Sequence, residues 1–89
     1  MNKQEIAEKR KEIKAEFGEL LIKHNSRFTF DHILDIIYRE DDNDNMMKIV
    51  AIFDRGNPME LDNILELATD AWNYFPHKAL KGKAPAEIL

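Results

Sequence analysis

The fold is decided by residues 57–76, which read NPMELDNILELATDAWNYFP. Asn57 can cap a helix, Pro58 fits the first helical position because its missing amide costs nothing there, and Glu60 completes a capping box. Behind this start, apolar residues recur at helical spacing: Leu61, Ile64, Leu65, Ala68, Trp72 and Phe75. Pro76 closes the pattern, since the residue before a proline avoids helical angles. The segment therefore predicts a helix over residues 58–75 with one buried face.

Three further helices are predicted before this segment, at about residues 2–24, 30–40 and 44–55. Each carries an apolar stripe at helical spacing: Ile6, Ile13, Phe17, Leu20 and Leu21; Phe30, Ile33, Leu34 and Ile37; Met46, Ile49, Val50 and Phe53. Thr29 is placed to cap the second helix. The first stripe is dense only in its second half, so we expect the first two turns to protrude or fray. The short junction at residues 55–58 predicts a tight corner between the third and fourth helices.

The residues after Pro76 predict a tail that folds back on the helices. Gly82 allows a turn, and Pro85 can start a last short helix. Leu80, Ile88 and Leu89 supply apolar anchors. We therefore predict an all-α fold: a single domain over residues 1–89, with a small bundle of four helices and a short C-terminal helical tail folded back.

Composition narrows the classes of protein to consider. Apolar residues make up 44% of the 89 residues and charged residues 34%, which is an ordinary globular composition. Cysteine is absent, which excludes disulfides and thiolate metal sites. The polar start predicts no signal peptide, and the apolar runs are far shorter than the roughly 20 residues of a membrane span. We expect a cytoplasmic protein with no membrane partner.

Charge is distributed unevenly along the chain. Residues 1–30 carry a net charge of +2, residues 31–75 of −8 and residues 76–89 of +2. The acidic middle would repel a phosphate backbone, so nucleic acid is an unlikely main partner. The fourth helix would also make a poor recognition helix, because it carries only acids among its charged residues: Glu60, Asp62, Glu66 and Asp70.

Two patterns in the sequence suggest metal binding, but each lacks residues that the metal site would require. An EF-hand loop starting at Asp41 would place Asn43 and Asn45 correctly, but Met46 and Ile52 occupy the positions that need glycine and glutamate. We predict instead an interhelical loop. His24, His32 and His77 fit no zinc or di-iron motif. We expect His24 near a helix C-terminus, and the other two at the surface or its boundary.

Catalytic motifs are also missing. Ser26 is the only serine and has no adjacent base in the sequence, and the three glycines are isolated, which leaves no phosphate-binding loop. We therefore expect no enzyme activity, no cofactor and no metal.

Residues 72–87 carry a motif that resembles a known pattern. WNYFPHKALKGKAPAE matches W-N-x-x-P-H-x-x-L-x-G-x-x-P-x-E, a pattern of uncharacterised bacterial and archaeal proteins. Some of those proteins continue into a cysteine-rich metal-binding tail, which is absent here, so the resemblance implies no metal role. A looser similarity is to the stretch that closes the catalytic domain of some transposases, whose carboxylate core has no counterpart in this chain. Read structurally, the two prolines, the glycine and the aromatic pair fold a tail onto the fourth helix.

Helix 2–24 leaves two interpretations open. Ile6, Ile13 and Leu20 lie seven residues apart as in a coiled coil, although Arg10 and His24 interrupt the seam. The stripe can pack on the domain's own core or mediate self-association.

Our leading hypothesis is a non-enzymatic helical interaction module that docks onto an unknown protein partner or onto itself. Its surfaces would be the first half of helix 2–24 and the corner at residues 72–80, and the candidate residues are Ile6, Ile13, Trp72, Phe75, Lys78, Lys81 and Lys83. The alternative is a regulatory or mobile-element-associated protein that contacts nucleic acid through the three tail lysines and the basic N-terminal segment.

Overall fold

A computed structural model describes residues 2–39, 45–53 and 58–88 of the chain, without the side chains of residues 58 and 59. These residues form five α-helices and one 3₁₀ turn: α1 (Lys3–Lys23), α2 (Phe30–Arg39), α3 (Asn45–Phe53), α4 (Pro58–Tyr74), η1 (Lys78–Leu80) and α5 (Pro85–Ile88). No strand occurs within the described ranges, and an isolated antiparallel bridge joins His77 and Lys83. The predicted all-α fold with four main helices and a short helical tail is confirmed.

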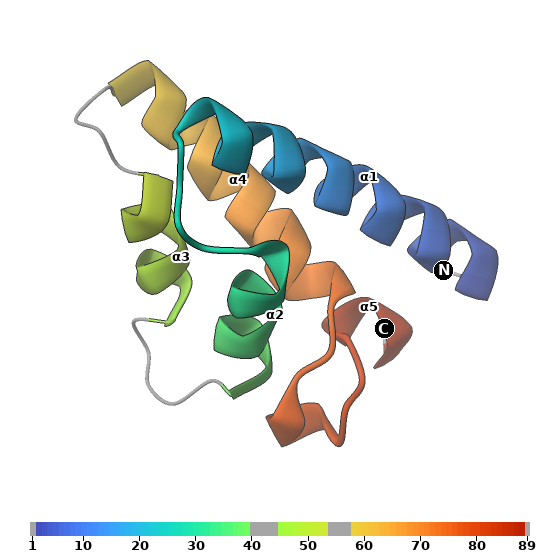
Figure 1. The fold of residues 1–89 in the computed structure, drawn as a ribbon. Helices are drawn as coiled ribbons and strands as arrows, with labels where there is room; N and C mark the ends of the chain where they lie inside the picture. Colours follow the sequence, from blue (N-terminus) through green and yellow to red (C-terminus); the bar gives the residue numbers. More distant parts are fainter. Residues whose placement is uncertain (1, 40–44, 54–57, 89) are drawn as a thin grey trace.

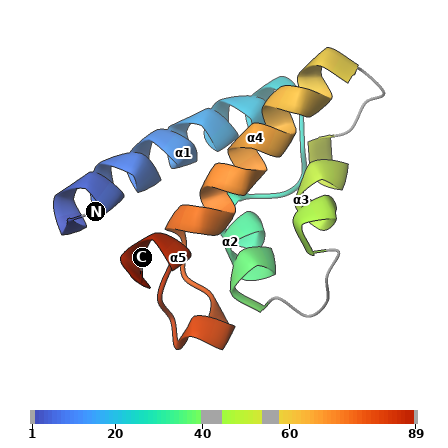
Figure 2. The ribbon, with the colours of Figure 1, turned by 180° about the vertical axis from the view of Figure 1, so that it is seen from behind.

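The two long helices form the spine of the molecule. Helices α1 and α4 run alongside each other, and α3 packs on α4 while α2 packs on α3 (Figure 1). After α4 the chain turns beneath the end of that helix, and α5 returns beside the first half of α1 (Figure 2). Within the tail, α5 contacts both α4 and α1 while η1 contacts α2, and both ends of the described chain lie on the same side of the molecule (Figure 2).

Aromatic rings link all four main helices in one core. Phe17 of α1 is fully buried, and its ring centroid lies 5.9 Å from that of Phe30 and 5.8 Å from that of Phe53. Phe30 in turn meets Phe75, just beyond α4, edge-on at 5.4 Å. Aromatic pairs at such distances add about 0.5–1.5 kcal/mol each beyond the burial of their area. Phe17 is therefore the residue whose loss should loosen the packing of the most helices.

The expectation that the first two turns of α1 protrude or fray is wrong. Asn2 caps the helix, because its Oδ1 accepts a hydrogen bond from the Glu5 amide at 2.8 Å. Ile6 is only 5% exposed and Ile13 only 4%, since α5 and α4 pack against this helix. The heptad-spaced residues of α1 are thus used inside the chain, which agrees with packing on its own core.

Hydrogen bonds and an ion pair fix how α2 and α4 begin. Thr29 caps α2 as predicted, since its Oγ1 accepts from the His32 amide at 3.4 Å. Glu60 in the first turn of α4 accepts from Lys23 Nζ at 2.8 Å, which ties the start of α4 to the end of α1. The hydrogen bond from Lys23 is the main reason that the pKa of Glu60 lies below its ordinary value. The expected capping box with Asn57 and the tight corner at residues 55–58 involve positions outside the described residues.

Candidate functional site

His77 is the buried centre of the tail. Its side chain is only 1% exposed, so the expectation of a surface or boundary residue is wrong. The ring lies edge-on to Trp72 at 4.8 Å, and Nε2 lies 2.6 Å from the Trp72 carbonyl oxygen. The chain turns back after Pro76 and carries the imidazole under the last turn of α4. His77 therefore satisfies a carbonyl at the end of this helix, where no further turn can do so.

The residues after His77 close a tight loop on its backbone. The His77 carbonyl accepts from the Leu80 amide at 3.2 Å and the Gly82 amide at 2.9 Å, and the His77 amide donates to the Lys83 carbonyl at 3.0 Å. Closing this loop requires positive φ angles of 58° at Lys81 and 81° at Gly82. The left-handed region is most accessible to glycine, which explains the glycine in the motif.

Arg10 and Glu87 join the tail to α1 through hydrogen bonds and an ion pair. The Arg10 Nε donates to the Tyr74 carbonyl at 2.6 Å, its Nη2 pairs with Glu87 at 2.9 Å, and the guanidinium lies 5.8 Å from the Phe75 ring centroid. The same Glu87 oxygen accepts from the Ala84 amide at 2.9 Å. This backbone hydrogen bond first, and then Arg10, hold the pKa of Glu87 below its ordinary value. The last glutamate of the motif thus joins α5 to α1.

The seven residues expected to form an interaction surface are not all exposed. Ile6, Ile13 and Phe75 are buried inside the chain, so these three offer no surface in this fold. Trp72 is half-buried against the core and His77. The three tail lysines, Lys78, Lys81 and Lys83, are exposed on η1 and the loop that follows it. Of the expected surface, only the lysines and part of one indole remain accessible.

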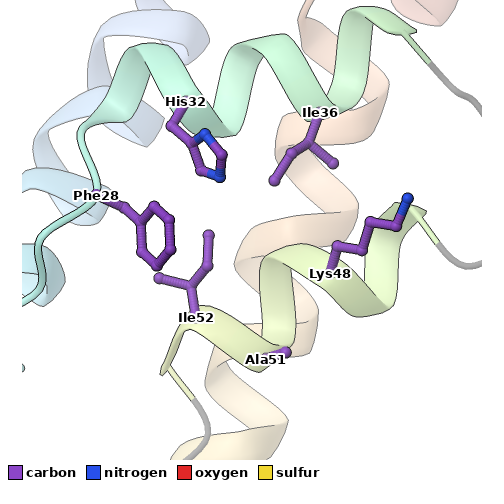
Figure 3. A pocket seen from close by; sticks show the side chains of 6 residues that line it. All are labelled: Phe28, His32, Ile36, Lys48, Ala51 and Ile52. Carbon is purple, nitrogen blue, oxygen red and sulfur yellow. The ribbon is translucent and has the colours of Figure 1, made fainter.

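A groove between α2 and α3 is lined mainly by apolar atoms. It has a cavity volume of about 430 Å³ and is lined by Phe28, His32, Ile36, Lys48, Ala51 and Ile52. Phe28, His32 and Ile36 face Ile52 and Lys48 across it (Figure 3). Phe28 is 45% exposed and stacks on His32 at 4.6 Å, and Met47 on α3 is 55% exposed. None of these residues was expected at an interaction surface from the sequence.

The two edges of α2 differ in chemistry. The edge toward α3 carries His32, while the edge toward the tail carries Asp31 and Tyr38 beside Pro76, around a hollow of about 300 Å³. Asp35 also lines this hollow and pairs with Arg39 at 3.0 Å. The exposed surface of α2 therefore presents basic and acidic groups side by side.

The structure describes only some of the residues considered above as metal ligands. Asp41 and Asn43 lie outside them, whereas Asn45 is buried and donates from Nδ2 to the Ile36 carbonyl at 2.9 Å. Asn45 thus braces α3 against α2. Among residues 2–39, 45–53 and 58–88, no group of three or more histidines and acids could hold a metal ion. His24 caps the C-terminus of α1 as expected, with its backbone amide bonded to the Leu20 carbonyl.

Comparisons with known proteins identify no relative from which a function could be inferred. The function must therefore be argued from the chemistry of these surfaces. No protein-family model, no curated protein and no solved structure matches the chain. None of the helices in the described ranges is long and apolar enough to cross a membrane. The α2–α3 groove and the lysine loop are therefore the two surfaces to be weighed.

Proposed function

We propose that this chain is a helical protein-interaction module that docks a partner on the α2–α3 face. This face is the groove together with the exposed Met47 of α3. The single observation that carries the proposal is the apolar groove with a partly exposed aromatic ring, Phe28, at its edge. Exposed apolar surface around a groove marks docking sites on other proteins, and helices bind such grooves through apolar residues on one face.

The distribution of exposed apolar side chains supports this face over others. Five large apolar side chains are exposed in the described ranges: Ile22, Phe28, Tyr38, Met47 and Ile88. Phe28 lines the groove and Met47 lies on α3, whereas Tyr38 lies on the opposite edge of α2. Aromatic residues and methionine are enriched in the cores of protein interfaces, where they bury large areas with few polar costs.

A site-specific photo-crosslinker tests the proposal. Benzoylphenylalanine replaces the exposed Met47 of α3, or Glu66 on the exposed side of α4 as the matched control. We expect position 47 to form a discrete adduct in cells that express the chain, with its partner identified by mass spectrometry and the binding reproduced with purified components. Position 66 should form none. Equal crosslinking at both positions, or none at position 47, would overturn the proposal.

A second candidate function rests on the lysine loop. Lys78, Lys81 and Lys83 are all exposed within six residues, and such clusters can contact phosphates. For nucleic-acid binding through this loop, replacing all three lysines with glutamine should reduce retention on duplex DNA. The slope of the logarithm of the binding constant against the logarithm of the salt concentration should become less steep by about 0.9 for each phosphate that the loop no longer neutralises. A wild-type chain that does not bind duplex DNA, or binding that this variant leaves unchanged, would exclude the loop as a nucleic-acid site.

A further inference from the structure

We infer that the hollow between α2 and Pro76 binds an arginine side chain of a partner polypeptide. This hollow lies on the edge of α2 opposite the α2–α3 face, so the inference goes beyond the proposed function and does not depend on it. The hollow has a volume of about 300 Å³ and is lined by Asp31, Leu34, Asp35, Tyr38 and Pro76. This volume is at the lower end of the range for ligand pockets, which suits a single long side chain.

The two carboxylates that line the hollow are not equally neutralised. Asp31 and Asp35 lie one turn apart on α2, at a spacing where like charges repel each other. The Arg39 Nε lies 3.0 Å from the Asp35 Oδ1 and compensates this second carboxylate. Within the described ranges, by contrast, Asp31 forms no ion pair and no side-chain hydrogen bond. A cation from another molecule would therefore pair with Asp31 and also reduce the repulsion between the two acids.

The apolar part of the hollow fits the aliphatic stem of a basic side chain. Its lining is mainly apolar, with Leu34 and Tyr38 one turn apart on α2 and Pro76 adding an apolar wall from beyond α4. Tyr38 is 42% exposed, so part of its ring is open to a ligand. Lysine and arginine pack their stems along such surfaces, and a cation is attracted to the face of an aromatic ring. The hollow thus combines the groups that a long basic side chain contacts.

Arginine fits these groups better than lysine. Its planar guanidinium carries five N–H donors, can bond to two carboxylates at once and stacks on aromatic rings, whereas an ammonium is a compact and strongly hydrated charge. The chain itself already makes one such contact beside the hollow, where Arg39 donates to Asp35. An arginine of the partner would make the same kind of contact one turn earlier, at Asp31.

A second hollow makes a polypeptide a better occupant than a free amino acid. It has a volume of about 450 Å³ and is lined by Asp35, Tyr38, Arg39 and Lys78, of which the first two also line the first hollow. A chain that places its arginine in the first hollow can therefore continue along the second. Arg39 and Lys78 are exposed there and can donate hydrogen bonds to its carbonyl groups. A free arginine would leave the second hollow empty.

NMR titration of the ¹⁵N-labelled full chain with the capped peptide acetyl-Gly-Gly-Arg-Gly-Gly-amide tests the inference. The guanidinium is the only charge of this peptide, and the same peptide with citrulline is its neutral control. We expect saturable shifts in the amides of residues 31–38 with the arginine peptide and none with the citrulline peptide. The corresponding lysine peptide should bind about twofold more weakly. N-acetylarginine amide should also bind more weakly, because it does not reach the second hollow.

Matched variants identify the acids that hold the guanidinium. Asp31→Asn should weaken binding of the arginine peptide about two- to fivefold, the range for an exposed charge pair. Asp62→Asn is the matched control, because Asp62 is an exposed acid of α4 that lines neither hollow, and it should leave binding unchanged. Unchanged amide positions elsewhere in the spectrum should show that both variants fold.

A gain of affinity tests the role of the second acid. Arg39→Gln releases Asp35 for the guanidinium of the peptide, so we expect it to strengthen binding about twofold. Lys14→Gln removes an exposed positive charge from α1 and controls for the change in net charge. A gain no larger than that of Lys14→Gln would overturn the sharing of the guanidinium between Asp31 and Asp35.

The remaining contrary outcomes are equally definite. Equal shifts with the arginine and citrulline peptides, or shifts centred on α4 in place of α2, would overturn the site. So would an Asp31→Asn variant that binds as tightly as Asp62→Asn. Equal affinity for the arginine and lysine peptides would overturn the choice of arginine. N-acetylarginine amide that binds as tightly as the peptide would overturn the choice of a polypeptide.

Discussion

Replacing Arg10 with methionine should release the tail from α1. Methionine keeps much of the aliphatic length but removes the Nε donor to the Tyr74 carbonyl, the pair with Glu87 and the cation over Phe75. A hydrogen bond from a charged donor contributes about 1.5–3 kcal/mol, and the cation–π contact adds about 0.5–1 kcal/mol. The pair with Glu87 adds little because both side chains are about one-third exposed. These contacts share one side chain, so we expect a loss of about 2–3 kcal/mol.

Urea unfolding followed by circular dichroism at pH 7 measures this loss. Lys9→Met is the matched control, since Lys9 is a neighbouring cation on α1 whose exposed pair with Glu12 has a distance of 3.8 Å. The control should change the free energy of unfolding by less than about 0.5 kcal/mol. If Arg10→Met is no less stable than the control, the contacts of Arg10 with the tail do not stabilise the fold, and the account of Arg10 is refuted.

Three further predictions address the core, the loop and the tail. Phe17→Ala should cost about 3–5 kcal/mol in a thermal melt, because it empties the buried centre of the aromatic cluster. Gly18→Ala should stabilise the chain by about 0.5–1 kcal/mol, because a Cβ there meets nothing within 4 Å, whereas Gly82→Ala should cost about 1–2 kcal/mol because φ is +81°. The folded carboxyl of Glu87 has a lowered pKa, so its stabilisation exists above the ordinary pKa of 4.5 and disappears as the pH falls through the folded value. Glu87→Gln should therefore be less stable than the wild type at pH 7 and equal to it in strong acid, and a difference that does not vary with pH would contradict this assignment.

The main helices could be predicted closely from local patterns. The segment expected at residues 2–24 is observed as Lys3–Lys23, and the one at 30–40 as Phe30–Arg39. Helix 44–55 is observed as Asn45–Phe53 and helix 58–75 as Pro58–Tyr74. This agreement has a physical cause, because apolar spacing, caps and prolines act over a few residues and are visible in a short stretch of sequence.

Long-range contacts account for what could not be predicted from the sequence. Arg10 was interpreted as a break in a heptad, but its partners lie 64 and 77 residues further along the chain. The first turns of α1 were expected to fray, because nothing in their own sequence shows that α5 returns to cover them. The prediction of a surface or boundary position for His77 is wrong because the residue is buried by the closure of the tail under Trp72, which its neighbours in sequence do not show. Such pairings depend on topology, which no local pattern encodes.

The motif of residues 72–87 has a structural explanation at its main polar positions. His77 satisfies the end of α4, Gly82 permits the loop and Glu87 holds α5 to α1. Because these positions are used inside the fold, the resemblance in the tail carries no argument for catalysis. The motif is thus accounted for by the folded tail.

The sequence did contain a signal for the α2–α3 groove. One helix face needs only a narrow apolar stripe to pack on a core, and in α3 that stripe is complete with Ile49, Val50 and Phe53. Met47 is an additional apolar residue outside it and is exposed, whereas Ile52, like Ile36 of α2, lines the groove while partly buried against the core. Placing further apolar side chains beside a completed stripe lowers solubility unless something covers them. An exposed apolar position beyond those that the core requires is therefore the pattern that points to docking, and a variant with a polar residue at position 47 would no longer carry it.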